Sequence, residues 1–121
     1  MDTDNGISTQ TVERCMEATR KFLKRNGYEI LGTDYACDAG VADVIALDDG
    51  VLCFIGVQEG WSSEDVTPQK RKVWEQVAIC YLAEHAANPG LDNVIVRFDL
   101  INVIAVSESR MFLRHHVNAL A

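Results

Sequence analysis

The sequence predicts an α+β domain in which two helices flank a mixed β-sheet. Residues 8–26 and 67–87 repeat apolar side chains at the three-to-four-residue spacing of an amphipathic helix. Residues 28–58 and 93–106 are instead rich in β-branched and aromatic residues. The expected order is therefore helix, three strands, helix, strand, which is typical of a mixed sheet with helices packed on it.

The first helix is predicted over residues 8–26. Gly27 follows it directly and is the residue type that most easily adopts the left-handed backbone conformation at a helix end. The face expected to be buried consists of apolar and small residues spaced by three or four: Val12, Cys15, Met16, Thr19, Phe22 and Leu23.

Three strands are predicted next, over 28–35, 41–47 and 51–58. Asp38-Ala39-Gly40 reads as the first turn between them, and Asp49-Gly50 as the second. Asp-Gly between two apolar runs is among the stronger short-range signals for a β-hairpin.

The second helix is predicted to begin at Thr67-Pro68, after a polar loop at 59–66. A threonine can cap a helix N-terminus, and a proline in the first turn costs no hydrogen bond. Asn88-Pro89-Gly90 ends the helix. Its buried face is expected to contain Val73, Trp74, Val77, Ala78, Tyr81 and Leu82.

Residues 93–106 predict one strand or a bent pair of strands. Residues 110–121 predict a short terminal helix, which would carry His115 and His116 on its surface. No cysteine or carboxylate lies at ligand spacing from these histidines, so they do not indicate a metal site.

Length and composition indicate one soluble domain at 8–121, preceded by a flexible tail at 1–7. The chain has 121 residues, of which 48% are hydrophobic and 24% charged, enough for a core without disulfides. The polar, acidic N-terminus excludes a secretory signal, and no apolar run is long enough to span a bilayer. We expect a cytoplasmic protein without a membrane partner.

The four cysteines do not form a zinc motif. Cys15, Cys37, Cys53 and Cys80 lie far apart, with no CxxC pair and no histidine at ligand spacing. Cys15, Cys53 and Cys80 fall in periodic segments and are expected to be small buried apolar residues, kept reduced in the cytosol.

Charge is distributed unevenly along a chain whose net charge is −7. Residues 26–69 contain nine acids and neither Lys nor Arg, so this stretch should repel phosphate. The cations gather at 14–25 and at Lys70-Arg71-Lys72. Solvated helix faces explain both clusters most simply, and a nucleic-acid patch is the alternative.

Several motifs, in order, resemble those of the YraN family of small bacterial proteins, which has no well-established function. The resemblance covers about residues 13–121. In the family, a Gly-Tyr-x-Ile-Leu strand is followed by Gly-Glu-Ile-Asp-Leu-Ile, Phe-Val-Glu-Val-Lys, Val-Thr-x-x-Lys, Arg-Phe-Asp and Asn-Ala. The corresponding segments here are 27–31, 40–45, 54–58, 66–70, 97–99 and 118–119.

The resemblance implies a restriction-endonuclease-like core with a degenerate PD-(D/E)xK nuclease site. Asp43 matches the family aspartate, but Val41 and Gly56 replace its two glutamates and Gln58 replaces its lysine. In such enzymes two carboxylates hold a divalent metal and the lysine orients the attacking water. Asp43 and Gln58 are therefore residual catalytic positions, with Asp43 the one retained metal-ligand position. No cofactor is expected.

Two ways of recovering metal binding remain open in the sequence. Glu13 or Glu17 on the first helix could reach Asp43, or Asp38 could turn inward from its hairpin. Glu59 should point to the opposite face from Gln58.

Three functions follow. The first is an inactive nuclease-fold module that binds nucleic acid through basic helix faces, or binds a protein or a second copy of itself. Lys70 and Arg71 are candidate binding residues, and Trp61 could stack on a base, anchor a partner or fold onto the core. The alternative is a weak Mg²⁺- or Mn²⁺-dependent DNA endonuclease with a rearranged carboxylate set. The third is a small-molecule site in the space left by the lost side chains.

Overall fold

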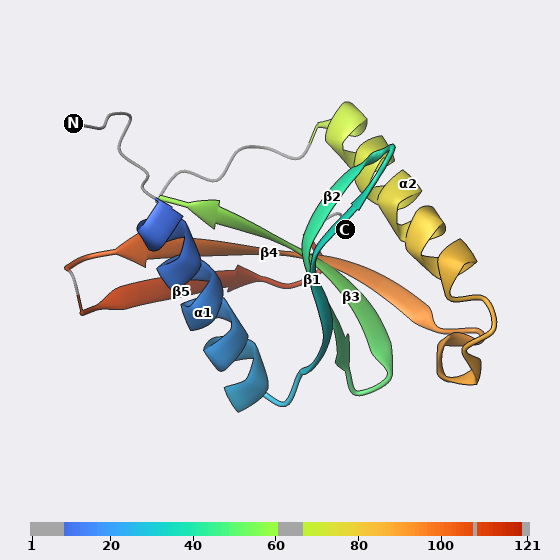
Figure 1. The fold of residues 1–121 in the computed structure, drawn as a ribbon, viewed down its shortest axis with the longest axis horizontal. Helices are drawn as coiled ribbons and strands as arrows, with labels where there is room; N and C mark the ends of the chain where they lie inside the picture. The colour runs from blue at the N-terminus through green and yellow to red at the C-terminus, as the bar shows by residue number, and fades with distance from the viewer. Residues whose placement is uncertain (1–8, 61–66, 108, 120–121) are drawn as a thin grey trace.

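A computed structural model describes residues 9–60, 67–107 and 109–119. Five strands form one mixed sheet in the order β1-β2-β3-β4-β5 (Figure 1). Strands β3 and β4 are parallel and are connected through α2, whereas the other neighbouring pairs are antiparallel. The predicted α+β class is confirmed. The helices and strands are α1 (Thr9–Arg25), β1 (Glu29–Cys37), β2 (Gly40–Asp48), β3 (Val51–Glu59), α2 (Pro68–Glu84), the short 3₁₀ helix η1 (Pro89–Leu91), β4 (Ile95–Ala105) and β5 (Met111–His116).

The turns and caps expected from the sequence are present. Gly27 ends α1 with a φ of 87°, and Asp49 and Gly50 join β2 to β3 with φ values of 51° and 85°. Two successive positive φ angles are characteristic of the tight turns that match the twist of a hairpin. At the start of α2, the Thr67 hydroxyl accepts a hydrogen bond from the Lys70 amide at 3.1 Å.

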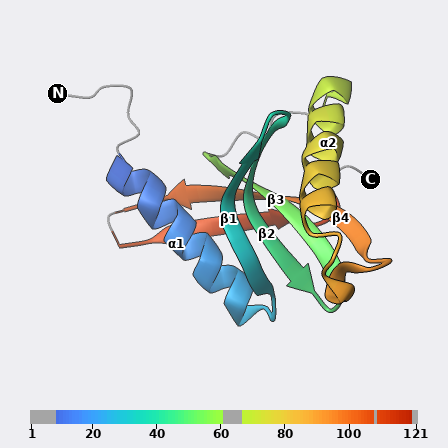
Figure 2. The same ribbon diagram turned by 45° about the vertical axis from the view of Figure 1, so that its right-hand side comes forward.

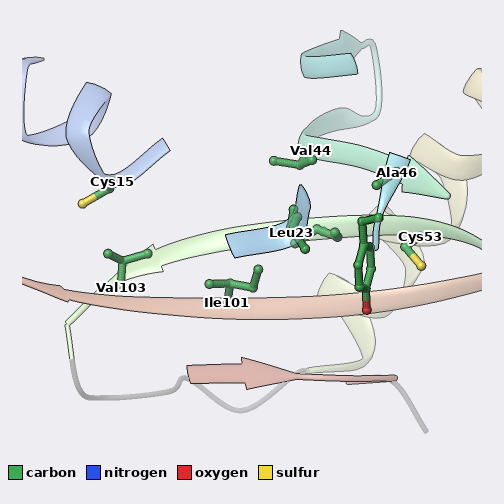
Figure 3. Packing of buried hydrophobic residues seen from close by; sticks show 9 residues of the cluster. Cys15, Leu23, Val44, Ala46, Cys53, Ile101 and Val103 are labelled. Carbon is green, nitrogen blue, oxygen red and sulfur yellow. The ribbon is translucent and has the colours of Figure 1, made fainter. Parts of the chain in front are cut away.

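The sheet separates two hydrophobic clusters, one beneath each helix. Alternation along β3 sends Cys53 and Ile55 to the α1 side, and Leu52 and Phe54 to the α2 side. Figure 3 shows the α1-side cluster, in which Leu23 of the helix lies over the strands. We refer to these as the α1 face and the α2 face; Figure 2 shows the two helices on either side of the twisted sheet.

The helix predicted over residues 110–121 is wrong, because Met111–His116 form the edge strand β5. This strand pairs antiparallel with β4, with Ile101 opposite His115. Met111 and Leu113 pack against the α1-side cluster at the two-residue spacing of a strand. Pairing also satisfies the backbone groups along the outer edge of β4. Residues 93–106, predicted as a strand or a bent pair, contain the single strand β4.

Two further findings concern the cysteines and the helices. Cys15 and Cys53 are buried as predicted, but Cys80 is half-exposed because it lies at the margin of the helix face that packs on the sheet. Neither α1 nor α2, nor any other helix in the described ranges, has the length and apolar character to cross a membrane.

Candidate functional site

The α2 face brings together three of the candidate residues predicted from the sequence. Asp43, Gln58 and Lys70 line one cavity of about 290 Å³. Val44 pairs with Ile55 across β2 and β3, so Asp43 lies beside Gly56 on the same face. Alternation places Gln58 on that face too. Asp43, Gly56 and Gln58 therefore lie on one face of these two strands.

Asp43 is held by the neighbouring strand. Its Oδ2 atom accepts a hydrogen bond from the Val57 backbone N–H at 2.8 Å. Burial raises the pKa of Asp43 and the negative charge of Asp34 adds to this, although the Val57 bond acts in the opposite direction. The carboxylate is thus partly desolvated, and its pKa rises because burial disfavours the charged form more than the single Val57 bond favours it.

A side chain at Gly56 would be crowded from its first carbon by Trp74 of α2 and Leu100 of β4. A Cβ atom added at Gly56 would lie 3.3 Å from Trp74 Cζ2 and 3.4 Å from Leu100 Cδ1. Trp74 is half-buried and forms a wall of the cavity, while its ring also lies 6.0 Å from that of Phe98. Trp74 therefore packs on the sheet as predicted, at the place where the family motif has a glutamate.

The candidate carboxylates for recovering a metal site lie elsewhere. Glu17 pairs with Lys21 at 3.7 Å and lines a groove beside α1. Glu59 accepts a hydrogen bond from the Cys15 thiol at 3.5 Å, also on the α1 side, as the alternation of the strand predicted. Glu13 and Asp38 are exposed. Within 9–60, 67–107 and 109–119, no group of three or more His, Cys, Asp or Glu residues could hold a metal ion.

The remaining candidate binding residues are dispersed. Arg71 is exposed in the first turn of α2 and does not line the cavity, unlike its neighbour Lys70. Trp61 lies outside the described residues.

A polar group that the sequence reading missed lies next to Gln58. Asn102 is opposite Gln58 in the parallel pair of β3 and β4, and is only 1% exposed. It donates to the Gly60 carbonyl at 3.3 Å, and its Oδ1 lies 3.0 Å from His116 Nε2. The sequence contained a signal for this group, because an asparagine between Ile101 and Val103 interrupts a strand of β-branched residues.

The α1 face contains a second missed group, a buried charge network centred on Asp99. Asp99 has no exposed surface and accepts hydrogen bonds from Arg97, from His115 Nε2 at 2.9 Å and from the Asn118 amide at 2.8 Å. Arg97 also contacts Asp48 Oδ2 at 3.0 Å. His115 is thus half-buried in β5, which corrects its predicted position on a surface helix.

Hydrogen bonding determines the charge state of this network. Burial alone would raise the pKa of Asp99, but the bonds from His115, Arg97 and the Asn118 amide outweigh it and lower the pKa to about 2. The bond to Asp99 in turn raises the pKa of Arg97. Arg97 and Asp99, two charged residues at i and i+2 in an apolar strand, were the visible signal. Their partner in β5 was hidden by the wrong helix prediction.

Comparison with known proteins identifies close similarity to one family. The model of the uncharacterised protein family UPF0102 matches residues 17–103. A UPF0102 protein of Chlorobaculum parvum is 40% identical over 104 residues, covering 79% of this chain and 76% of the relative. One of Pelotomaculum thermopropionicum is 31% identical over 110 residues, covering 85% and 88%. One of Caldicellulosiruptor bescii is 33% identical over 88 residues, covering 68% and 71%.

Proposed function

This chain belongs to the uncharacterised bacterial family UPF0102, the YraN family, and we propose that it is a nuclease-fold protein that binds nucleic acid without cleaving it. The observation that carries the binding role is a cationic groove between α1 and β5. The groove lies on the α1 side, away from the cavity that contains Asp43. The binding surface and the former catalytic site are therefore separate.

The donor set at Asp43 supports the absence of cleavage. Magnesium and manganese prefer about six oxygen ligands in near-octahedral geometry, several of them from carboxylates, phosphates and water. Among the described residues that line the cavity, Asp43 is the one carboxylate, and one of its oxygens already accepts the Val57 amide. The residues at this site do not fit the two-carboxylate arrangement of a metal-dependent nuclease.

The groove has a volume of about 530 Å³ and is bordered by cations in an otherwise acidic molecule. Arg14, Lys21 and Arg25 line it from α1. Their spacing of seven and four residues places them on one side of the helix. Eleven residues of α-helix extend about 16 Å, which equals about five nucleotides at the per-strand spacing of duplex DNA.

β5 forms the other wall of this groove, and an exposed aromatic residue of that strand, Phe112, lies beside it. Phe112 of β5 is 50% exposed, and the Arg110 guanidinium lies 5.8 Å from the centre of its ring. Exposed aromatic rings beside cations are the usual platform on which unpaired bases stack. The combination favours a single-stranded nucleic acid over a duplex, in which the bases are already stacked.

An acidic residue also lines the groove, so a substitution there can test for stronger binding as well as weaker binding. Glu17 lines it, and its ion pair with Lys21 joins side chains that are 60% and 68% exposed. Such a pair contributes little to stability, so removing the carboxylate should leave the fold intact. The same change would remove repulsion of phosphate.

The test is fluorescence anisotropy with labelled single-stranded and duplex DNA over a range of salt concentrations. If three phosphates are contacted, the logarithm of the binding constant should fall against the logarithm of salt with a slope of about −2 for a single strand. The double variant Lys21→Gln/Arg25→Gln should reduce the slope to about −0.7, because one cation remains. Glu17→Gln should strengthen binding. Phe112→Ala should weaken binding of single-stranded DNA more than binding of duplex DNA.

The matched control is Arg71→Gln/Lys72→Gln, which removes the same charge from exposed positions at the start of α2. This control should bind as the unaltered chain does. If it alone weakens binding, the nucleic acid is bound by the α2 cluster, and the groove assignment is wrong. If no DNA or RNA binds at low salt, the proposed function fails. A protein partner or a homodimer, detectable by sedimentation, then becomes the leading alternative.

A weak metal-dependent DNA endonuclease is the second candidate, and one observation favours it. Asp43, Gln58 and Lys70 still line a common cavity, so a carboxylate, an amide and an amine lie on its walls. The test is cleavage of single-stranded, duplex and branched DNA with Mg²⁺ or Mn²⁺. Cleavage that disappears in Asp43→Ala, while DNA binding persists, would replace the non-catalytic proposal.

A further inference from the structure

We propose that Cys37 and Cys80 are a redox-active thiol pair that closes to an intramolecular disulfide bond. Cys37 is the last residue of β1, and Cys80 lies in the fourth turn of α2. Both are half-exposed, and each lies within two residues of the contact between the Tyr35 and Tyr81 rings that joins β1 to α2. The other two cysteines, Cys15 and Cys53, are buried. This inference is independent of nucleic-acid binding.

Packing on both sides of the pair holds the two thiols together. After Cys37, the turn approaches α2 so closely that a Cβ atom added at Gly40 would lie 2.9 Å from Val73 Cγ1. Cys80 follows Val73 by seven residues, so both lie on the same side of α2. Before Cys37, the Tyr35 ring meets that of Tyr81 edge to face, with 5.3 Å between centres. The thiols therefore lie between two fixed contacts of the hairpin with the helix.

The two sulfurs have different environments, which assigns their roles. Burial acts to raise the pKa of Cys37, but hydrogen bonds from the Ala39 and Gly40 amides and from Cys80 outweigh it and lower that pKa. The hydrogen bond to Cys37 raises the pKa of Cys80, and burial adds to this. Thiolates rather than thiols are the nucleophiles in oxidation, so Cys37 reacts first and Cys80 second.

Hydrogen peroxide is an oxidant of the required class. The Cys37 thiolate attacks one peroxide oxygen, the O–O bond breaks, and the hydroxide that leaves takes a proton to become water; Cys37 becomes a sulfenic acid. The Cys80 sulfur then attacks the Cys37 sulfur. The S–O bond breaks, a second water leaves with the Cys80 proton, and the S–S bond forms. Two thiols are oxidised by two electrons and one peroxide is reduced to two waters.

The bond would join the β1–β2 hairpin to α2, and both elements wall the cavity that contains Asp43. Cys15 and Cys53 serve as internal controls. Burial raises their pKa values to about 11 and about 12, respectively, so neither should form a reactive thiolate at neutral pH.

The experiment treats the reduced full chain with one equivalent of hydrogen peroxide, blocks remaining thiols with iodoacetamide and maps the peptides by mass spectrometry. Cleavage at acidic residues is required, because no Lys or Arg separates Cys37 from Cys53. The expected product is a Cys37–Cys80 cross-linked pair lacking two hydrogen atoms, with Cys15 and Cys53 alkylated only after unfolding. Before oxidation, Cys37 should be alkylated faster than Cys80, because its pKa is lowered and that of Cys80 is raised, which gives Cys37 the larger thiolate fraction.

Three variants distinguish the roles. Cys80→Ser should leave a Cys37 sulfenic acid that dimedone traps, Cys37→Ser should abolish both products, and Cys53→Ser should oxidise as the unaltered chain does. The proposal is overturned if the cross-link joins another pair, if only intermolecular dimers form, or if Cys37 and Cys80 oxidise no faster than in the chain unfolded in urea.

Discussion

The two faces of the sheet shift the pKa values of their buried carboxylates in opposite directions. Asp99, on the α1 face, accepts bonds from Arg97, His115 and a backbone amide, and its pKa is lowered to about 2. Asp43, on the α2 face, accepts one backbone N–H, and its pKa is raised. The difference shows that burial alone does not set the charge state of a carboxylate, since burial raises the pKa of both and the donors decide the outcome.

The two carboxylates also differ in what they hold together. The Asp99 network joins β4 to β5 and to the end of β2 through Asp48, so its charges hold strands together. Asp43 instead lines a cavity whose opposite wall is the ring of Trp74. We therefore expect loss of the charge at Asp99 to lower stability strongly, and loss of the charge at Asp43 to act weakly.

The largest effect is expected for Asp99→Asn. An amide cannot accept all the bonds that Asp99 accepts, and the Arg97 charge loses its main buried partner. Breaking a buried pair on one side costs about 3–5 kcal/mol, because the other charge remains buried. Urea unfolding followed by circular dichroism measures the loss.

The matched control for this prediction is Asp48→Asn. Asp48 bonds the same arginine, but its side chain is 32% exposed and solvent can compensate the change. We expect the control to cost about 1 kcal/mol or less. Equal losses of stability in the two variants would show that the buried ion pair of Arg97 with Asp99 contributes no more than its partly exposed pair with Asp48.

The same residue predicts a loss of stability in acid. The pKa of Asp99 is lowered from an ordinary value of 3.8 to about 2, so the unfolded chain binds the proton more readily than the folded one. The contribution, on the order of 2 kcal/mol, is fully present above about pH 5 and is lost as pH falls from about 5 to 2. Unfolding in urea at pH 7, 4 and 3 should show this loss, and the loss should be smaller in Asp99→Asn. If the free energy of unfolding depends on pH in the same way in Asp99→Asn, the loss of stability in acid comes from other carboxylates.

The sequence predicted the parts of the fold that local chemistry determines. The hairpin turn at Asp49-Gly50, the Thr67-Pro68 helix start and the Gly27 helix end depend on residues that are adjacent in the chain. The edge strand β5 depends instead on pairing with β4, which no local pattern shows, and its mixture of apolar and basic residues fits a helix as well as a strand. The Asp99 network was missed for the same reason, because Asp48, Asp99 and His115 come from three separate strands.

A glutamate placed at Gly56 tests how closely Trp74 of α2 covers this position. Gly56→Glu should destabilise the chain by about 1–3 kcal/mol, because even its Cβ would crowd the Trp74 ring and its carboxylate would enter a largely apolar cavity. Gly56→Ala is the size control and should cost less than about 1 kcal/mol. In a Trp74→Ala background the added cost of Gly56→Glu should fall. An equal cost in both backgrounds would show that Trp74 does not occupy the place of the lost side chain.

The positions of the candidate site were predictable from strand alternation, but its surroundings were not. Asp43, Gly56 and Gln58 share a face because residues at i and i+2 of a strand do. That Lys70 and Trp74 lie over them depends on how α2 returns across the sheet between β3 and β4. The proximity of Cys37 and Cys80, 43 residues apart, has the same origin, since it depends on where the hairpin meets α2.

The smallest effect is expected for Asp43→Asn. Because the folded pKa of Asp43 is raised, the folded state favours the protonated carboxyl, and ionisation at neutral pH opposes folding. An asparagine removes this cost while its oxygen still accepts the Val57 amide, so stability at pH 7 should be unchanged or higher by less than about 1 kcal/mol. The difference should shrink as pH falls below the unfolded value of about 4, where Asp43 is protonated in both states.

Asp43→Ala is the contrasting control, because it leaves the Val57 N–H without its acceptor and should cost about 1–3 kcal/mol. Urea unfolding at pH 7 and pH 3.5 measures both variants. A loss in Asp43→Asn comparable to that in Asp99→Asn would mean that the Asp43 carboxylate is bound by a cation in solution, and the contrast between the two faces would then fail.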